Sequence, residues 1–135
     1  MITVGVIPWK YVFPQAKHLF YSKENAEYLD FVSVHFYPKK GDIENALNAL
    51  RFYDIGKPVV IEEMFPLECS KEEMDIFIEG SRNFVDGWIS FYWGKSIGDY
   101  DCETLSIGDA IRKEWLEYFV YKGRVITERN YKIPR

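Results

Sequence analysis

Four runs of almost continuous apolar residues divide the chain at regular intervals. They cover residues 2–7, 31–37, 58–64 and 87–93, and they are rich in Val, Ile and aromatic residues. Short apolar runs without strict alternation are typical of strands that are buried on both faces. We therefore predict four buried strands, separated by polar loops and helices.

Helical patterns follow these runs. Apolar residues recur at helical spacing between Asp42, a candidate cap, and Gly56, a candidate helix end. The segment 70–73 has the sequence of a capping box, which predicts a helix immediately after it. Ser106 is a candidate cap for a last long helix, which Gly123 is predicted to end.

The spacing of these elements predicts the fold class. One strand and one helix recur about every 28 residues, which is typical of parallel βα units. A shorter helix is predicted within residues 22–29, and the segment 8–14 is predicted to be a loop. The chain is therefore predicted to be α/β, with a domain of four βα units over residues 1–122 and a charged tail over 123–135, in which 125–126 could form an edge strand.

Two architectures have this rhythm, the open doubly wound sheet and the closed (β/α)₈ barrel. No Gly-rich phosphate loop follows the first strand and no Walker A motif occurs, so the barrel is favoured, nucleotide binding is not expected and no cofactor is predicted. A closed barrel needs roughly 250 residues. The 135-residue chain therefore corresponds to half of one.

Candidate functional side chains stand at the ends of the predicted strands. His35 and Tyr37 end the second strand, Glu62 and Glu63 the third, and residues 91–93 the fourth. The carboxyl ends of parallel strands share one rim, where the functional residues of barrels gather. Side chains alternate along a strand, so His35 and Tyr37 share a face, while only one of the two glutamates is expected to serve the mouth. Taken singly, each of these residues also has a structural interpretation, as core packing or a solvent-facing group.

These segments resemble a known family. Residues 34–38 (VHFYP), 57–63 (KPVVIEE) and 87–94 (GWISFYWG) are similar to strands six, seven and eight of family 5 glycoside hydrolases, and residues 2–5 are similar to strand five. That family comprises the cellulase and β-mannanase type enzymes of the clan A barrels. The resemblance spans about residues 1–120 and implies the carboxyl-terminal half of a (β/α)₈ TIM barrel that acts on β-linked oligo- or polysaccharides.

The resemblance also implies roles for individual residues. Glu63 corresponds to the nucleophile of a retaining glycosidase, Tyr37 to the residue that hydrogen-bonds it, and His35 to the residue that orients it or contacts the sugar. Glu62 inherits no role, because the family varies at that position. Aromatic side chains are assigned to substrate binding: Trp93, with Phe91 as the competing alignment, and Trp9.

The family's acid/base residue has no counterpart in the chain. It belongs to an Asn-Glu-Pro motif on strand four, which by this alignment would precede Met1. Glu68 and Asp99 lie in predicted loops, and we do not assign either as a replacement. A retaining mechanism needs two carboxyl groups. The chain alone is therefore expected to be inactive or very weakly active.

The composition and charge of the chain restrict the classes of partner that it can bind. With 17 Lys and Arg against 21 Asp and Glu, the formal net charge is −4, which argues against nucleic acid and anionic membranes as partners. No apolar run approaches the roughly 18 residues that span a bilayer. Residues 1–8 lack the basic segment of a signal peptide, so we expect a cytoplasmic protein if the chain is complete and leave secretion open if it is a fragment.

Other functions remain open. Cys69 and Cys102 are either two free thiols or one bridge, and neither has a spaced partner for zinc or another metal. A non-catalytic half-barrel is the main alternative: it would form a homodimer, dock with a separate amino-terminal half, or bind carbohydrate through its aromatic residues, which make up 18% of the chain. Another barrel enzyme, such as an isomerase or aldolase, would need a metal cluster or a strand-borne Lys, and neither stands at the predicted strand ends.

Overall fold

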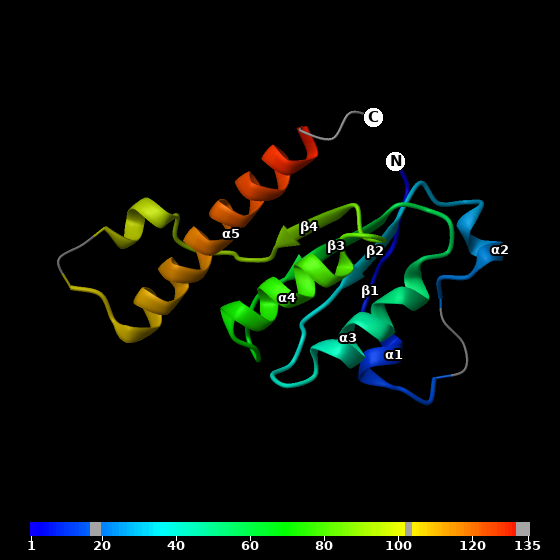
Figure 1. Cartoon of the computed structure of the whole chain (residues 1–135), viewed down its shortest axis with the longest axis horizontal. Helices are drawn as coiled ribbons and strands as arrows, with labels where there is room; N and C mark the ends of the chain where they lie inside the picture. The colour runs from blue at the N-terminus through cyan, green and yellow to red at the C-terminus, as the bar shows by residue number, and fades with distance from the viewer. Residues whose placement is uncertain (17–19, 102–103, 132–135) are drawn as a thin grey trace. The chain divides into compact units, whose positions relative to one another are not determined.

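The computed structural model describes residues 1–16, 20–101 and 104–131. The chain forms two compact units, Met1–Phe91 and Tyr92–Arg135. The first unit contains the sheet and helices α1 to α4, and the second contains the short 3₁₀ helix η2 and the long helix α5 (Figure 1).

The first unit is built on a parallel sheet of four strands in the order β1-β2-β3-β4. Each strand lies inside one of the four predicted apolar runs, and helices alternate with the strands, so the predicted α/β fold of parallel βα units is confirmed. Each strand is shorter than its run, β1 most of all. The strands are β1 (Gly5–Val6), β2 (Val32–His35), β3 (Val59–Met64) and β4 (Gly87–Ser90).

Serine residues start two of the helices as the sequence predicts. Helix α2 (Lys23–Ala26) follows Ser22, whose side chain accepts a hydrogen bond from a backbone N–H of the first turn. Helix α4 (Lys71–Ser81) follows Ser70, which forms a complete capping box with Glu73. Local sequence alone therefore sets the start of both helices.

Helix α3 (Ile43–Leu50) begins at the predicted position, but its cap differs. The carboxylate of Asp42 makes no hydrogen bond to the helix backbone, and instead accepts one from the Asn45 side chain at 2.6 Å. The 3₁₀ helix η1 (Arg51–Tyr53) extends α3. Gly56 follows with a φ of +88°, a left-handed conformation that favours glycine and agrees with its predicted role in ending this helical segment.

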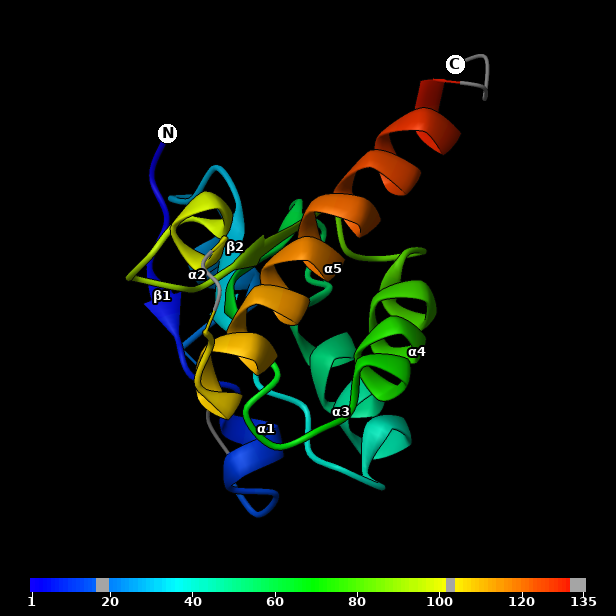
Figure 2. The same cartoon turned by 90° about the vertical axis from the view of Figure 1, so that its left-hand side faces the viewer.

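The core of the first unit lies between the sheet and helices α3 and α4, which lie side by side on one face (Figures 1 and 2). Helix α1 (Trp9–Val12), in a segment predicted to be a loop, packs against α3. Phe36 joins core and strand end, because its ring lies 5.0 Å from that of Tyr11 and 5.1 Å from that of Phe77, centroid to centroid. The buried side chains include Val32, Val34, Val59, Ile61, Ala46, Leu50, Met74, Phe77 and Ile78.

The buried phenol of Tyr53 predicts a loss of stability at high pH. Tyr53 is 1% exposed, its oxygen accepts from the Trp9 N–H at 3.0 Å, and burial raises its pKa to about 12. An unfolded tyrosine ionises near pH 10. Above that pH the unfolded state loses a proton that the native state keeps, so the free energy of unfolding falls by roughly 2 to 3 kcal/mol as the pH rises towards 12. Urea titrations across this pH range should show a smaller fall for Tyr53→Phe, and an equal fall in both proteins would contradict the assignment.

A register shift joins β2 to β3 at the strand ends. Val34 pairs with Ile61, but the next residue of β2, His35, pairs with Glu63 and not with Glu62. The extra residue, Glu62, therefore lies opposite no residue of β2. Irregularities of this kind locally re-aim side chains and are over-represented next to functional sites.

The second unit corrects the prediction for the carboxyl terminus. Ser106 starts α5 (Ile107–Tyr131) as predicted, its hydroxyl accepting from the Asp109 N–H at 3.1 Å. The helix does not end at Gly123 but continues through it, so the predicted helix end and the predicted edge strand at 125–126 are both wrong. One interior glycine costs a helix only about 1 kcal/mol, and the residues after it include good helix formers. This unit also contains the 3₁₀ helix η2 (Ile97–Tyr100).

Candidate active site

The ends of β2 and β3 place one imidazole between two carboxylates. His35 Nε2 lies 3.0 Å from Glu62 Oε1, and His35 Nδ1 lies 3.2 Å from Glu63 Oε2. Tyr37 donates its hydroxyl proton to the other oxygen of Glu63, Oε1, at 2.5 Å. The three predicted catalytic residues are therefore in direct contact, and Glu62 is attached to them through the ring.

Both glutamates contact one ring, which differs from the opposite faces that alternation predicts, although only Glu63 lines the neighbouring cavity. Strict alternation predicted that only one of Glu62 and Glu63 would serve the mouth of the sheet. The register shift breaks that alternation, because it sets His35 opposite Glu63 and leaves Glu62 unpaired beside it. Both carboxylates consequently reach the same ring, one at each nitrogen.

Gly5 makes room for this arrangement on β1. A Cβ at position 5 would lie 2.3 Å from Glu62 Oε1 and 2.8 Å from His35 Nε2, closer than side-chain carbons approach such atoms. The φ of Gly5 is not in the left-handed region, so its conformation does not require glycine. Glycine is favoured because a Cβ would displace the ends of the Glu62 and His35 side chains.

A cavity of about 240 Å³ opens beside Glu63. Its apolar wall comes from the segment after β1, including Ile7 and Val12. Neither Glu62 nor Trp9 lines it. The polar groups that line it are His35, Tyr37, Glu63, Tyr11, Lys39 and Glu68.

The two tyrosines of the cavity are held in their protonated form. Burial, together with the hydrogen bond to the Glu63 carboxylate, raises the pKa of Tyr37 well above its ordinary value. Burial raises the pKa of Tyr11 to about 12, although the Lys39 N–H, which donates to its oxygen at 2.9 Å, acts in the opposite direction. Tyr37 is therefore a permanent donor to Glu63 across the neutral range.

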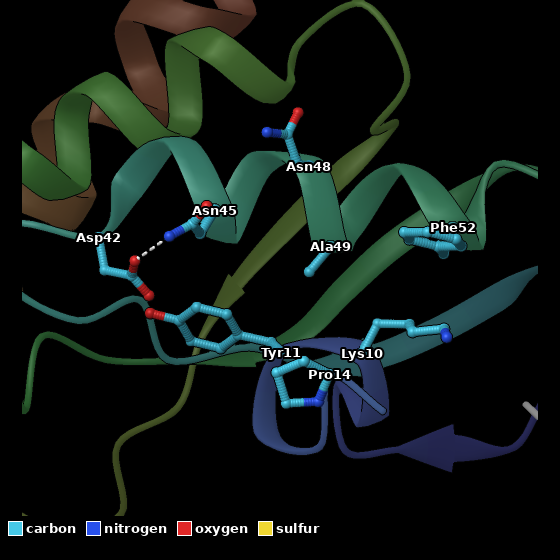
Figure 3. A pocket seen from close by; sticks show the side chains of 8 residues that line it. All are labelled: Lys10, Tyr11, Pro14, Asp42, Asn45, Asn48, Ala49 and Phe52. Carbon is cyan, nitrogen blue, oxygen red and sulfur yellow. Dashed lines mark hydrogen bonds between the residues drawn. The ribbon is translucent and has the colours of Figure 1, made fainter. Parts of the chain in front are cut away.

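A larger cavity of about 460 Å³ lies between α1 and α3 (Figure 3). Asp42 and Asn45 lie at one end of it, and Lys10 lies with its ammonium 5.4 Å from the centre of the Phe52 ring at the other. The one carboxylate that lines this larger cavity, that of Asp42, already accepts a hydrogen bond from the Asn45 amide. Glu63 and His35 line the smaller cavity, and Glu62 contacts His35 beside it. We therefore take the smaller cavity as the candidate site. Tyr11 lines both.

Two of the aromatic residues assigned to the sugar, Trp9 and Phe91, do not line the smaller cavity. Trp9 is the first residue of α1, and its ring stacks on Phe13 with centroids 5.0 Å apart. Phe91 follows β4 and is 52% exposed, without lining the cavity. Trp93 belongs to the second unit, where its side chain is 96% exposed. Their roles in substrate binding stay predictions.

Sequence reasoning missed several residues of the site. Gly5 carried a usable signal, because a glycine inside an apolar strand often marks a close approach by another group. Glu68, to which we assigned no role, lines the cavity. No pattern in the sequence pointed to Tyr11 or Lys39. Both line the cavity only because the folded chain brings them beside the strand ends.

Some kinds of site are not found in the described part of the chain. No cluster of three or more His, Cys, Asp or Glu suited to a metal ion occurs among residues 1–16, 20–101 and 104–131. In the same ranges, no helix combines the length and hydrophobicity needed to cross a bilayer. Cys69 is a free thiol whose pKa burial raises to about 11, and Cys102 lies outside the described residues.

No family model, curated protein or solved structure matches the chain. The fold class therefore rests on the sheet topology, and function has to be argued from the geometry of the site.

Proposed function

We propose that the chain carries the nucleophile half of a retaining glycoside hydrolase of the cellulase and mannanase type, with β-linked glycans as substrates. The observation that carries the proposal is the environment of Glu63. Its carboxylate lines a cavity, accepts the Tyr37 hydroxyl on one oxygen and contacts His35 with the other. A nucleophile needs such fixed orientation and an open side.

The chemistry defines what is still required. In a retaining mechanism one carboxylate attacks the anomeric carbon while a second carboxyl group, about 5 Å away, protonates the leaving oxygen. Glu63 suits the first role. The acid/base belongs to a strand that the chain's resemblance to the family does not cover. Alone, the chain should therefore react only with substrates whose leaving group departs without a proton.

The proposal includes the fold, with the four βα units as strands five to eight of a barrel. The edges of the sheet support it, because Val4 beside β1 is 42% exposed and Ile89 of β4 is 52% exposed. Open edges with exposed apolar residues favour pairing with further strands, and a barrel removes such edges altogether. Closure would come from a second copy of the chain or from a separate half that carries the first four strands.

Light scattering distinguishes these two routes to closure. If a second copy closes the barrel, the full chain should have the mass of a dimer at micromolar concentration. A stable, well-behaved monomer would contradict self-association and leave a separate half as the partner.

Covalent labelling tests the nucleophile. A dinitrophenyl fluoroglycoside of β configuration loses dinitrophenolate without protonation, so the missing acid does not limit the first step, and the fluorine slows hydrolysis of the resulting ester. The anomeric C–O bond to dinitrophenolate breaks and a bond to a Glu63 oxygen forms. We expect the mass of one sugar on Glu63, separated from Glu62 and Glu68 by fragment ions. An adduct on another residue, or none with either gluco or manno reagents, would refute the assignment.

A further inference from the structure

The two adjacent glutamates of β3 have different surroundings. Glu63 lines the cavity, whereas Glu62 does not and reaches it only through His35, which does. The side chains of Glu62 and His35 are each about one-third exposed, at 31% and 32%. Neither sequence similarity nor the role proposed for Glu63 gives Glu62 a task.

The fold makes specific provision for Glu62. The register shift sets it out of the β2 pairing, and Gly5 leaves open the space into which its carboxylate extends. Any larger residue at position 5 would meet Glu62 Oε1 at 2.3 Å. Two strands are therefore adapted to bring this carboxylate to the Nε2 side of the ring.

Hydrogen-bond donors and acceptors explain what the contact requires. A neutral imidazole has one N–H donor and one acceptor nitrogen, and an ionised carboxylate only accepts. His35 faces a carboxylate with each nitrogen, so both contacts are hydrogen bonds only when the three groups share one further proton. With that proton on the ring, the cluster carries a net charge of −1.

We propose that Glu62 is a positioning residue that holds the His35 ring against Glu63 and balances its charge while Glu63 reacts. The inference rests on the proposed function of Glu63. When Glu63 attacks the anomeric carbon it becomes a neutral ester, and an imidazolium beside it loses its counter-charge. Glu62, bonded to the opposite nitrogen, remains to pair with the ring, so the glycosyl ester is not formed next to an uncompensated cation.

The other charged and titratable groups near the ring are few. On β1, Gly5 lies against the Glu62 and His35 side chains, and Tyr37, two residues after β2, bonds Glu63. The remaining groups that line the same cavity are Tyr11 from α1, Lys39 and Glu68. Glu62 and Glu63 are the two carboxylates in contact with His35 among the described residues.

The test uses Glu62→Gln in the full chain, with two readouts. Glutamine keeps the size and can still hydrogen-bond the ring, but it removes the charge. The chain has two histidines, so a His18→Gln background leaves His35 as the sole imidazole for ¹⁵N NMR. We expect the ring ¹⁵N resonances of His35 to shift, because the partner of Nε2 changes from a carboxylate to an amide. Labelling of Glu63 by the dinitrophenyl fluoroglycoside should slow about tenfold, with a changed pH profile.

Two further variants secure the interpretation. Gly5→Ala keeps every ionisable group, but its Cβ would displace the ends of both the Glu62 and the His35 side chains and disturb their contact, so it should alter both readouts if Glu62→Gln fails to fold. Glu44→Gln removes an exposed carboxylate on α3 that does not line the cavity, and it should change neither readout.

The outcomes separate the two proposals. Unchanged His35 resonances in Glu62→Gln would show that Glu62 does not hold the ring, whatever the labelling result. Altered resonances with an unchanged labelling rate and pH profile would overturn the positioning role alone. No labelling of the wild-type chain would reject the proposed function, and the positioning role with it.

Discussion

Replacing Glu63 by glutamine is expected to abolish the burst of dinitrophenolate that the chain releases from a dinitrophenyl β-glycoside. The wild-type burst should approach about one equivalent per chain, because the glycosyl ester accumulates when no base activates water to hydrolyse it. Glutamine at position 63 keeps the shape and the Tyr37 contact but cannot form the ester. Stopped-flow absorbance should therefore show the burst amplitude fall to none.

Two comparisons test whether the burst is lost because the nucleophile is missing and not because the fold is disturbed. Glu44→Gln removes a carboxylate that is exposed on α3 and should retain the full burst. In Glu63→Ala, added azide should take the place of the carboxylate, so that the bond to dinitrophenolate breaks, a C–N bond forms and the α-glycosyl azide is released. A burst that survives in Glu63→Gln would mean that another residue attacks the sugar.

Replacing Ile78 by alanine is expected to lower the free energy of unfolding by about 2 to 5 kcal/mol. Ile78 is 1% exposed on the inner face of α4, and truncation removes buried methyl groups and leaves a cavity. Urea unfolding followed by circular dichroism measures the change. A loss of this size is a large fraction of the stability of an ordinary domain.

The same helix supplies a matched control two residues away. Ile76 is 58% exposed, so Ile76→Ala should change the free energy of unfolding by no more than about 0.5 kcal/mol. The higher helix propensity of alanine offsets part of the lost contact area. Equal losses for the two variants would mean that α4 does not bury the face that carries Ile78.

Local patterns predicted the elements that depend on local interactions. The capping box of Ser70 and Glu73 starts α4 where expected, because its partners are three residues apart. The four apolar runs contain the four strands, since strands buried on both faces have nearly continuous apolar composition. Helix α1 was missed because a single turn that packs against α3 has too little periodicity of its own.

The sequence predicted three members of the site, but not the other residues that line the cavity and not the geometry. His35, Tyr37 and Glu63 were assigned to one rim from the ends of parallel strands, and they are in contact. The part played by Glu62 was not foreseen, because it depends on a register shift between two strands that are 27 residues apart in the chain. Strand register depends on pairing and burial over such distances, which alternation along one strand does not report.

The order of residues thus specified a parallel α/β sheet and the side chains that stand at its carboxyl edge, because apolar runs mark short segments and their regular spacing indicates parallel βα units. The resemblance assigned the nucleophile to Glu63, but alternation along the strand by itself left open which carboxylate would face the cavity. The folded chain settled that point: Gly5 on β1, the shifted pairing of β2 with β3, and the packing of α1 put Glu63 on the cavity and Glu62 behind the His35 ring. Each of these contacts joins segments that are distant in sequence, so its energy exists only after the strands have paired.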